Sequence, residues 1–208
     1  MIHLYSGDGK GKTSIAVGMA IRMAGAGGHI IFAQFMKGNE SSELNILRQL
    51  PQVKVLKVNK EFGFFNEMSD EDKAEITGLH NEIIEEIEEF VEQIKSNEQS
   101  NPEHDEVPKC EGNSEHNVVQ GYKGDARKDA CPQVIIVLDE ITYPCRWNLI
   151  DEKLVRKLLK ELPDCAELVM TGRDPLDYMI EASDYWSDVE MKKHPYEKGV
   201  SARLGIEY

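Results

Sequence analysis

Short, wholly apolar runs recur along the chain, and most are separated by longer segments with a different pattern. The clearest run is Val134 to Leu138, and the run 53–58 differs in alternating apolar with polar residues. Uninterrupted apolar runs of this length are typical of buried parallel strands, whereas alternation is typical of a half-buried strand. The six strands predicted in this way are 2–5, 29–34, 53–58, 134–138, 166–170 and 186–189.

Helical spacing dominates the segments between these runs. From Asp70 to Lys95 the apolar residues recur every three or four positions, and glutamates fill much of the opposite face, which predicts one long amphipathic helix. Three further helices are expected at 13–26, 153–162 and 175–182. Helices that alternate with apolar strands predict an α/β fold: a mostly parallel sheet of about six strands, with helices on both faces.

The segment 96–132 interrupts this alternation. It is crowded with Asn, Glu, Gly, Pro, Lys and Asp and contains almost no large apolar residue, so it cannot repay the entropy of ordering. We therefore expect a single domain over 1–208 that carries a mobile polar insertion. The potential metal ligands inside the insertion have irregular spacings, which argues against a metal site; they are His104, Cys110, His116 and Cys131.

Charge and composition restrict the partners of the protein. The 38 acidic residues outnumber the 24 basic ones, for a net charge of -14, which disfavours a nucleic-acid or anionic-membrane surface. No basic leader precedes an apolar run, and no apolar stretch approaches the roughly 20 residues of a membrane span, so we expect a cytoplasmic protein. The four cysteines contain no C-x-x-C pair, which favours free thiols.

A glycine-rich loop links the first predicted strand to the first predicted helix. The stretch SGDGKGKTS fits the pattern G-x-x-x-x-G-K-[ST], except that Ser6 stands at the first glycine position. In such a loop the backbone amides, the lysine and the helix N-terminus bind phosphate groups. The expected phosphate-binding residues are Gly7, Asp8, Gly9, Lys10, Gly11, Lys12, Thr13 and Ser14.

Two acidic residues, Asp139 and Glu140, follow the most apolar strand. A carboxylate at a strand end can hold Mg²⁺, directly or through water, beside the hydroxyl of Thr13. Since ligands of parallel sheets gather at the carboxyl ends of the strands, loop and acid pair together predict Mg²⁺-ATP binding in a P-loop NTPase-like fold.

Other polar and aromatic residues also follow strands. Lys37 and Arg173 follow two strands and are candidates for phosphate or carboxamide contacts, with surface turns as the alternative. The cluster Glu61-Phe62-Gly63-Phe64-Phe65 permits two interpretations: core packing, or the wall of a site for a flat apolar ligand.

The chain resembles the P-loop type of the ATP:corrinoid adenosyltransferase family from end to end. The resemblance rests on the stretches SGDGKGKTS, QFMKGNESSELNIL, EFGFF, VIIVLDEITY, LVMTGRD and KKHPYEKGVSARLGIEY. It implies transfer of the adenosyl group of ATP to the Co(I) centre of a corrinoid, with release of inorganic triphosphate. It leaves open whether the acceptor is cobalamin, cobinamide or cobyrinic acid a,c-diamide.

The resemblance also implies roles for individual residues. Gly7 to Ser14 would hold the triphosphate, while Thr13 and one or both of Asp139 and Glu140 would hold Mg²⁺. Glu43 and Arg173 fall on further motif positions that contact ligands. Phe62 and Phe64 match paired aromatics that displace the lower axial ligand of cobalt. The residues expected to be catalytic are Lys12, Phe62, Phe64 and Glu140.

Partners and rival functions follow from the same resemblance. The chain contains no sign of a flavin or iron-sulfur site, so an external electron donor such as a reduced flavoprotein is implied, as is a homodimer. Many bacterial relatives have Trp where Phe64 stands. An ordinary P-loop ATPase or phosphotransferase is the main rival, and a catalytically weak protein that binds ATP or a corrinoid is the second.

Overall fold

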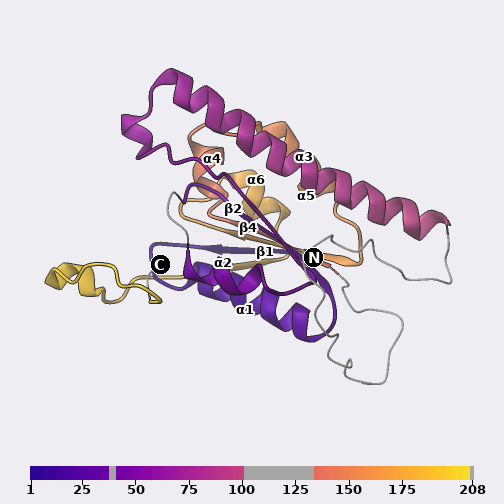
Figure 1. Ribbon diagram of the computed structural model, residues 1–208, viewed down its shortest axis with the longest axis horizontal. Coiled ribbons are helices and arrows are strands. Elements are labelled where there is room, and N and C mark those ends of the chain that lie inside the picture. Colours follow the sequence, from indigo (N-terminus) through magenta and orange to yellow (C-terminus); the bar gives the residue numbers. More distant parts are fainter. Residues whose placement is uncertain (38–40, 101–133, 207–208) are drawn as a thin grey trace.

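The computed structural model describes residues 1–37, 41–100 and 134–206. Six strands form one sheet in the order β3-β2-β4-β5-β1-β6, and every neighbouring pair is parallel (Figure 1). This confirms the predicted fold class. The strands are β1 Ile2–Ser6, β2 His29–Gln34, β3 Val53–Lys57, β4 Val134–Asp139, β5 Ala166–Thr171 and β6 Tyr185–Asp188.

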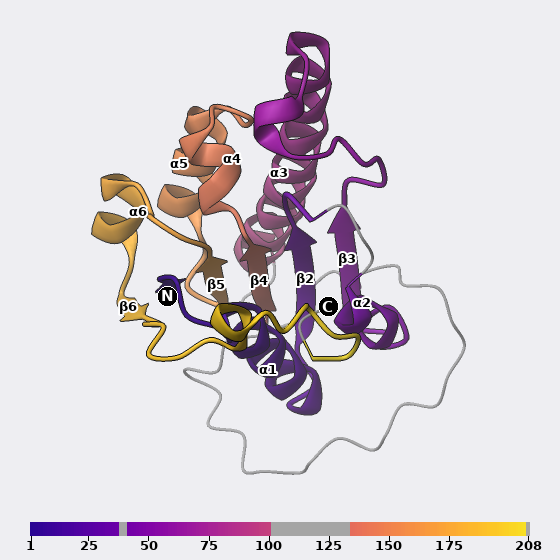
Figure 2. The same ribbon diagram turned by 90° about the vertical axis from the view of Figure 1, so that its left-hand side faces the viewer.

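Helices cover both faces of the sheet. On one face lie α1 (Lys12–Gly25) and α2 (Ser42–Leu47). On the other lie α3 (Asp70–Ser100), α4 (Thr142–Arg146), α5 (Glu152–Glu161) and α6 (Asp177–Ala182), with the long α3 extending beyond the edge of the sheet (Figures 1 and 2).

Successive side chains of β2 point to opposite faces of the sheet, and both sets are buried under helices. Ile31 and Ala33 pack in the core beneath α3 and α5, whereas Ile30 and Phe32 pack in the core beneath α1 and α2. All four side chains are at most 1% exposed. Because both faces of the strand are buried, its apolar run is uninterrupted, as a parallel strand between two helix layers requires.

Helix α3 continues to Ser100, so the prediction that a polar insertion begins at residue 96 was wrong by five residues. Lys95 pairs with Glu161 at 3.1 Å, and the Ser96 hydroxyl donates to the carbonyl of Glu92 at 2.8 Å. Once a helix is formed, each further residue adds a backbone hydrogen bond, so polar residues can prolong it. Residues 101–132 of the predicted insertion lie outside the described residues.

Several short elements escaped prediction, namely α2, α4 and the 3-10 turns Phe65–Glu67 and Pro195–Lys198. Elements of this length contain too few turns to show a period. Strand β6 begins and ends one residue earlier than expected. Cys145 and Cys165, the cysteines in the described part of the chain, are not disulfide-bonded. In the same part of the chain, no helix has the length and apolar character needed to cross a membrane.

The parallel register brings polar residues that are distant in the sequence together at the carboxyl ends of the strands. Gln34 is paired with Asp139 across β2 and β4, and Tyr5 is paired with Thr171 across β1 and β5. The glycine-rich loop, residues 7–11 and called the phosphate loop below, leaves β1 at the same carboxyl ends of the strands. The carboxyl ends of four neighbouring strands therefore build the site.

Candidate active site

The glycine-rich loop joins β1 to α1 and closes around its own lysine. Gly7 and Gly11 have φ angles of 110° and 119°, which favour glycine. The Lys12 ammonium donates to the carbonyls of Gly7 and Gly9 at 2.7 and 2.9 Å. Burial lowers the pKa of Lys12, although Glu140 and other carboxylates oppose this shift. The loop thus positions a positive charge among backbone groups that can face phosphates.

Asp139 at the end of β4 gathers donors from four segments. Its carboxylate is fully buried and accepts hydrogen bonds from Thr13 Oγ1 at 2.9 Å and Thr171 Oγ1 at 2.7 Å. Gln34 Nε2 donates to it at 3.2 Å and Lys37 Nζ at 2.9 Å. Buried carboxylates are costly unless paired in this way. Asp139 therefore ties the phosphate loop to strands β2 and β5.

Lys37, three residues beyond β2, lies between three acceptors. Its ammonium is 2.9 Å from Asp139 Oδ2, 3.0 Å from Thr13 Oγ1 and 3.7 Å from Glu43 Oε1. Burial disfavours its charge, but Asp139 and Glu43 outweigh burial and raise the pKa of Lys37. The side chain is therefore a firmly charged cation at the centre of the site.

Glu140 follows Asp139 in an unusual backbone conformation, with φ of 61°. Its amide donates to Thr171 Oγ1 at 2.9 Å, which holds the turn. Burial and the neighbouring Asp139 raise the pKa of Glu140. Its Oε2 atom is buried and has no hydrogen-bond partner among the described residues. Strained residues and unsatisfied acceptors of this kind are concentrated at functional sites.

A cavity of about 660 Å³ lies against the phosphate loop, a volume that suits a small-molecule ligand. The sequence-predicted residues that line it are Asp8, Gly9, Lys10, Gly11, Lys12, Thr13, Ser14, Lys37, Glu43, Glu140 and Arg173. Two other predicted residues, Gly7 and Asp139, are not among the lining residues. Sequence reasoning gave no role to Ser42, His194 or Ile206, which also line it.

The segment after β6 crosses the phosphate loop as a strap, residues 189–191. The Gly9 amide donates to the carbonyl of Val189 at 2.6 Å, and the Met191 amide donates to Asp8 Oδ1 at 2.9 Å. A Cβ atom on Gly9 would lie 2.5 Å from the Val189 carbonyl oxygen, so glycine is required there by close approach. Figure 2 shows this last part of the chain passing in front of the amino end of α1.

The structure also explains the serine at the first glycine position of the loop motif. Ser6 is 2% exposed, and its hydroxyl accepts a hydrogen bond of 2.8 Å from the indole of Trp186 on β6. Ser6 thus connects β1 to the strand that leads into the strap.

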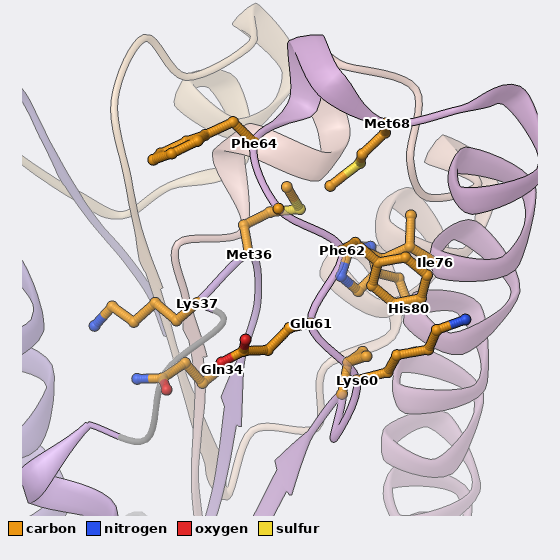
Figure 3. A pocket seen from close by; sticks show the side chains of 12 residues that line it. Gln34, Met36, Lys37, Lys60, Glu61, Phe62, Phe64, Met68, Ile76 and His80 are labelled. Carbon is orange, nitrogen blue, oxygen red and sulfur yellow. The ribbon is translucent and has the colours of Figure 1, made fainter.

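A second cavity, of about 420 Å³, shares Lys37 with the first, and Figure 3 shows the side chains that line it. Its apolar lining comes from Met36, Val58, Phe62, Phe64, Met68 and Ile76. Phe62 packs against a small cluster that contains Met68 and Ile76, whereas Phe64 is 80% exposed. The core-packing interpretation is confirmed for Phe62, which also lines the cavity, while a flat apolar ligand there stays a prediction.

His80 of α3 lines the second cavity and gave no signal in the sequence. Its ring is fully buried, and Nδ1 lies 2.8 Å from the carbonyl of Leu149, which can only accept, so Nδ1 carries the hydrogen. Nε2 has no partner among the described residues, and burial lowers the pKa of His80. The ring is therefore a neutral, buried hydrogen-bond acceptor.

The donor set of the first cavity fits a hard cation. No group of three or more His, Cys, Asp or Glu side chains within the described ranges is arranged to hold a metal by itself. Thr13 and Glu140 line the cavity with one hydroxyl and one carboxylate, the buried carboxylate of Asp139 accepts a hydrogen bond from that hydroxyl, and a bound triphosphate would add further oxygen atoms. Mg²⁺ prefers such a mixture of carboxylate and phosphate oxygens.

Two solved structures with a similar fold are parts of EssC, and one of them comprises its ATPases 2 and 3. "EssC (ATPases 2 and 3) from Geobacillus thermodenitrificans" superposes with a TM-score of 0.54 at 16% identity, over 99% of this chain and 36% of that one. "The cytoplasmic domain of EssC" gives 0.52 at 15% identity, over 98% of this chain and 35% of that one. At this level of identity the likeness concerns the fold.

Curated relatives are named corrinoid adenosyltransferase. The one from Pseudomonas aeruginosa is 27% identical over 207 residues, 99% of this chain and 82% of its own. The one from Escherichia coli K12 is 24% identical, over 100% of this chain and 85% of its own. A Sinorhizobium relative is 36% identical over 75 residues, 36% of this chain and 35% of its own.

The family model described as "ATP:corrinoid adenosyltransferase BtuR/CobO/CobP" matches residues 1–208. The described geometry is compatible with this family, since the cavity against the glycine-rich loop and the aromatic-lined cavity share Lys37. The chain therefore belongs to the ATP:corrinoid adenosyltransferase family.

Proposed function

We propose that this protein binds ATP in the 660 Å³ cavity and a corrinoid in the 420 Å³ cavity, and transfers the 5′-deoxyadenosyl group to Co(I). The observation that carries the proposal is that the two cavities meet at Lys37, which lines both. A reaction between two bulky substrates needs two adjoining sites whose contents meet at one point. The acceptor is cobalamin, cobinamide or cobyrinic acid a,c-diamide.

The phosphate loop acts in this proposal on a leaving group. Cobalt attacks the 5′ carbon with its own electron pair, a Co–C bond forms, and the C–O bond to the triphosphate breaks. No proton is transferred, so the site needs no general base. The loop amides, Lys12 and Arg173 would stabilise the negative charge that develops on the departing triphosphate.

Mg²⁺ fits this arrangement, and Thr13, Asp139 and Glu140 are the residues that would hold it. The buried, unpartnered Oε2 of Glu140 supports the assignment, because a nearby cation would satisfy it. When bound, the ion neutralises charge on the triphosphate.

The second cavity has the chemistry to hold a corrinoid face. Phe62 and Phe64 present apolar surface and no ligand atom for cobalt. We propose that they exclude the lower axial ligand of Co(II), which lowers the energy of the orbital that accepts the electron. The electron would come from an external donor such as a reduced flavoprotein, and a homodimer is the proposed assembly.

Anaerobic incubation with ATP, Mg²⁺ and chemically reduced cobalamin tests the proposal. The absorbance change of Co–C bond formation should appear, and phosphate analysis should find triphosphate in equal amount. Release of ADP and phosphate without that change would support the ATPase or phosphotransferase alternative. Tight binding of ATP and corrinoid without turnover would support a binding protein.

A further inference from the structure

The ammonium of Lys37 lies where a metal ion would meet its ligands. Nζ is 2.9 Å from Asp139 Oδ2 and 3.0 Å from Thr13 Oγ1, and these two side chains are proposed ligands of Mg²⁺. We infer that Lys37 is an internal counter-cation: it occupies the metal position in the ligand-free protein and is replaced there by Mg²⁺ that arrives with ATP. The inference rests on the proposed Mg²⁺-ATP site.

Lys37 and the metal ion exclude each other at this position. A magnesium ion lies about 2.0–2.1 Å from its oxygen ligands, so it needs the lone pairs that the ammonium now uses. Two positive charges at such a separation also repel strongly in a partly buried site, where screening is weak. Free Mg²⁺ therefore competes poorly, whereas Mg²⁺ bound to triphosphate brings oxygens and negative charge of its own.

After displacement by the metal ion, the Lys37 ammonium can pair with the nearby carboxylate of Glu43. Lys37 has a flexible four-carbon stem and already lies 3.7 Å from Glu43 Oε1, which lines the nucleotide cavity. Among the described residues, Lys37 alone lines both cavities. From their boundary the ammonium can contact the end of the triphosphate nearest the 5′ carbon, where charge develops as the C–O bond breaks. One lysine would thus serve as a stand-in for the metal before binding and as a leaving-group contact afterwards.

Binding of Mn²⁺ measures this exchange, because Mn²⁺ accepts the same oxygen ligands and its free form has a distinct paramagnetic resonance signal. In the absence of nucleotide, the wild-type protein should leave Mn²⁺ free. Lys37→Met should bind it at least about tenfold more tightly, since the competing charge is gone while the carboxylates remain. Lys54→Met, which removes the same charge from an exposed ion pair with Glu86, should behave as wild type.

Adding inorganic triphosphate completes the test. Wild type should then bind Mn²⁺ tightly, and the difference from Lys37→Met should shrink. Equal Mn²⁺ affinity of wild type and Lys37→Met without triphosphate would overturn the inference. If circular dichroism shows that Lys37→Met is unfolded, Lys37→Gln replaces it. The wild-type comparison is a further check, because Mn²⁺ affinity that is unchanged by triphosphate would also contradict the exchange.

The readout separates the two proposals, because it needs neither corrinoid nor turnover. If Mn²⁺ binding follows the expected pattern but no Co–C bond forms with reduced cobalamin, the counter-cation role stands and the proposed reaction fails. If adenosyl transfer occurs but Lys37→Met gains no Mn²⁺ affinity, the reaction stands and the counter-cation role fails.

Discussion

Thr13 Oγ1 donates to both carboxylate oxygens of Asp139, at 2.9 and 3.2 Å. The two residues are 126 positions apart, one in the first turn of α1 and the other at the end of β4. The bond fixes the amino end of α1 against the central strands. It therefore makes the position of the phosphate loop depend on the charge of one buried carboxylate.

We expect Asp139→Asn to lower the free energy of unfolding by about 1–3 kcal/mol, the cost of leaving buried partners unsatisfied. The amide keeps the shape of the carboxylate but replaces an acceptor by a donor, which faces the donors of Thr13, Thr171 and Lys37. Urea unfolding measures the change. Asp164→Asn, at an exposed turn, should stay within about 0.5 kcal/mol of wild type. Equal stability of the two variants would show that the Asp139 network contributes little.

Lys12→Ala should weaken binding of ATP and inorganic triphosphate about 10- to 100-fold, because a hydrogen bond from a charged group contributes about 1.5–3 kcal/mol. At ATP concentrations near the wild-type Kd the variant would bind little ATP and would also lack a charge that stabilises the departing triphosphate, so adenosyl transfer should be abolished there. Calorimetric titration with triphosphate gives the affinity. Lys157→Ala, which removes an exposed charge paired with Glu88, is the matched control. Unchanged triphosphate affinity in Lys12→Ala would argue against the loop as the triphosphate site.

Phe62 and Phe64, which line the second cavity, should differ in their effect on stability. Phe62 packs against Met68 and Ile76, so Phe62→Ala should cost about 2 kcal/mol, roughly half the value for a fully buried phenylalanine. Phe64 is 80% exposed, so Phe64→Ala should stay within about 0.5 kcal/mol of wild type. Thermal unfolding curves compare the two.

Both aromatic variants should impair adenosylation that starts from Co(II) more than adenosylation that starts from chemically reduced Co(I), because the proposed aromatic wall acts on the reduction step. Parallel assays from the two oxidation states measure this ratio. Equal losses in the two assays would remove the aromatics from the reduction step and leave them a role in binding alone.

His80 should make the protein less stable in mild acid. Burial lowers the pKa of the folded ring, whereas the unfolded ring titrates near 6.5, so the unfolded state binds the proton more readily. Above about pH 6.5, His80 should therefore cause no change of the free energy of unfolding with pH. Below that pH, its protonation in the unfolded state should lower the free energy of unfolding by up to about 1.4 kcal/mol per pH unit.

His80→Gln tests this, since a glutamine amide can still donate to the Leu149 carbonyl but has no proton to take up. Urea midpoints at pH 7.5 and 5.5 should differ less in His80→Gln than in wild type. His194→Gln, in the tail after β6, should keep the wild-type difference. A wild-type difference that survives in His80→Gln would assign the acid sensitivity to other groups.

The core was predictable because each buried strand is an uninterrupted apolar run, as in Val134 to Leu138. The short helices α2 and α4 were not, since neither is long enough to show a period, and α4 also contains Pro144 at its third position. The end of α3 was misplaced because composition indicates where a core ends, and a helix can extend past that point.

The candidate site was predictable where residues directly follow strands. Asp139, Lys37 and Arg173 were singled out on that basis, and the structure places them at one edge. Thr13 was expected beside Asp139, and the proximity of the strand ends was foreseen. The individual hydrogen bonds of Gln34 and Thr171 to Asp139 were not predictable, because they depend on the register of the parallel sheet. His80 is a single polar residue on the buried face of a helix, and its sequence context does not distinguish a structural histidine from one that lines a cavity.

The strap over the phosphate loop has a consequence for biosynthesis. The loop spans residues 7–11, but the amide of Gly9 is held by the carbonyl of Val189, and β1 acquires its β6 neighbour only through residues 185–188. During synthesis the loop therefore leaves the ribosome nearly 180 residues before the segment that fixes it. A nascent chain cannot form these contacts until translation has passed Met191, so the proposed ATP site is completed well after the strand and helix that carry the loop.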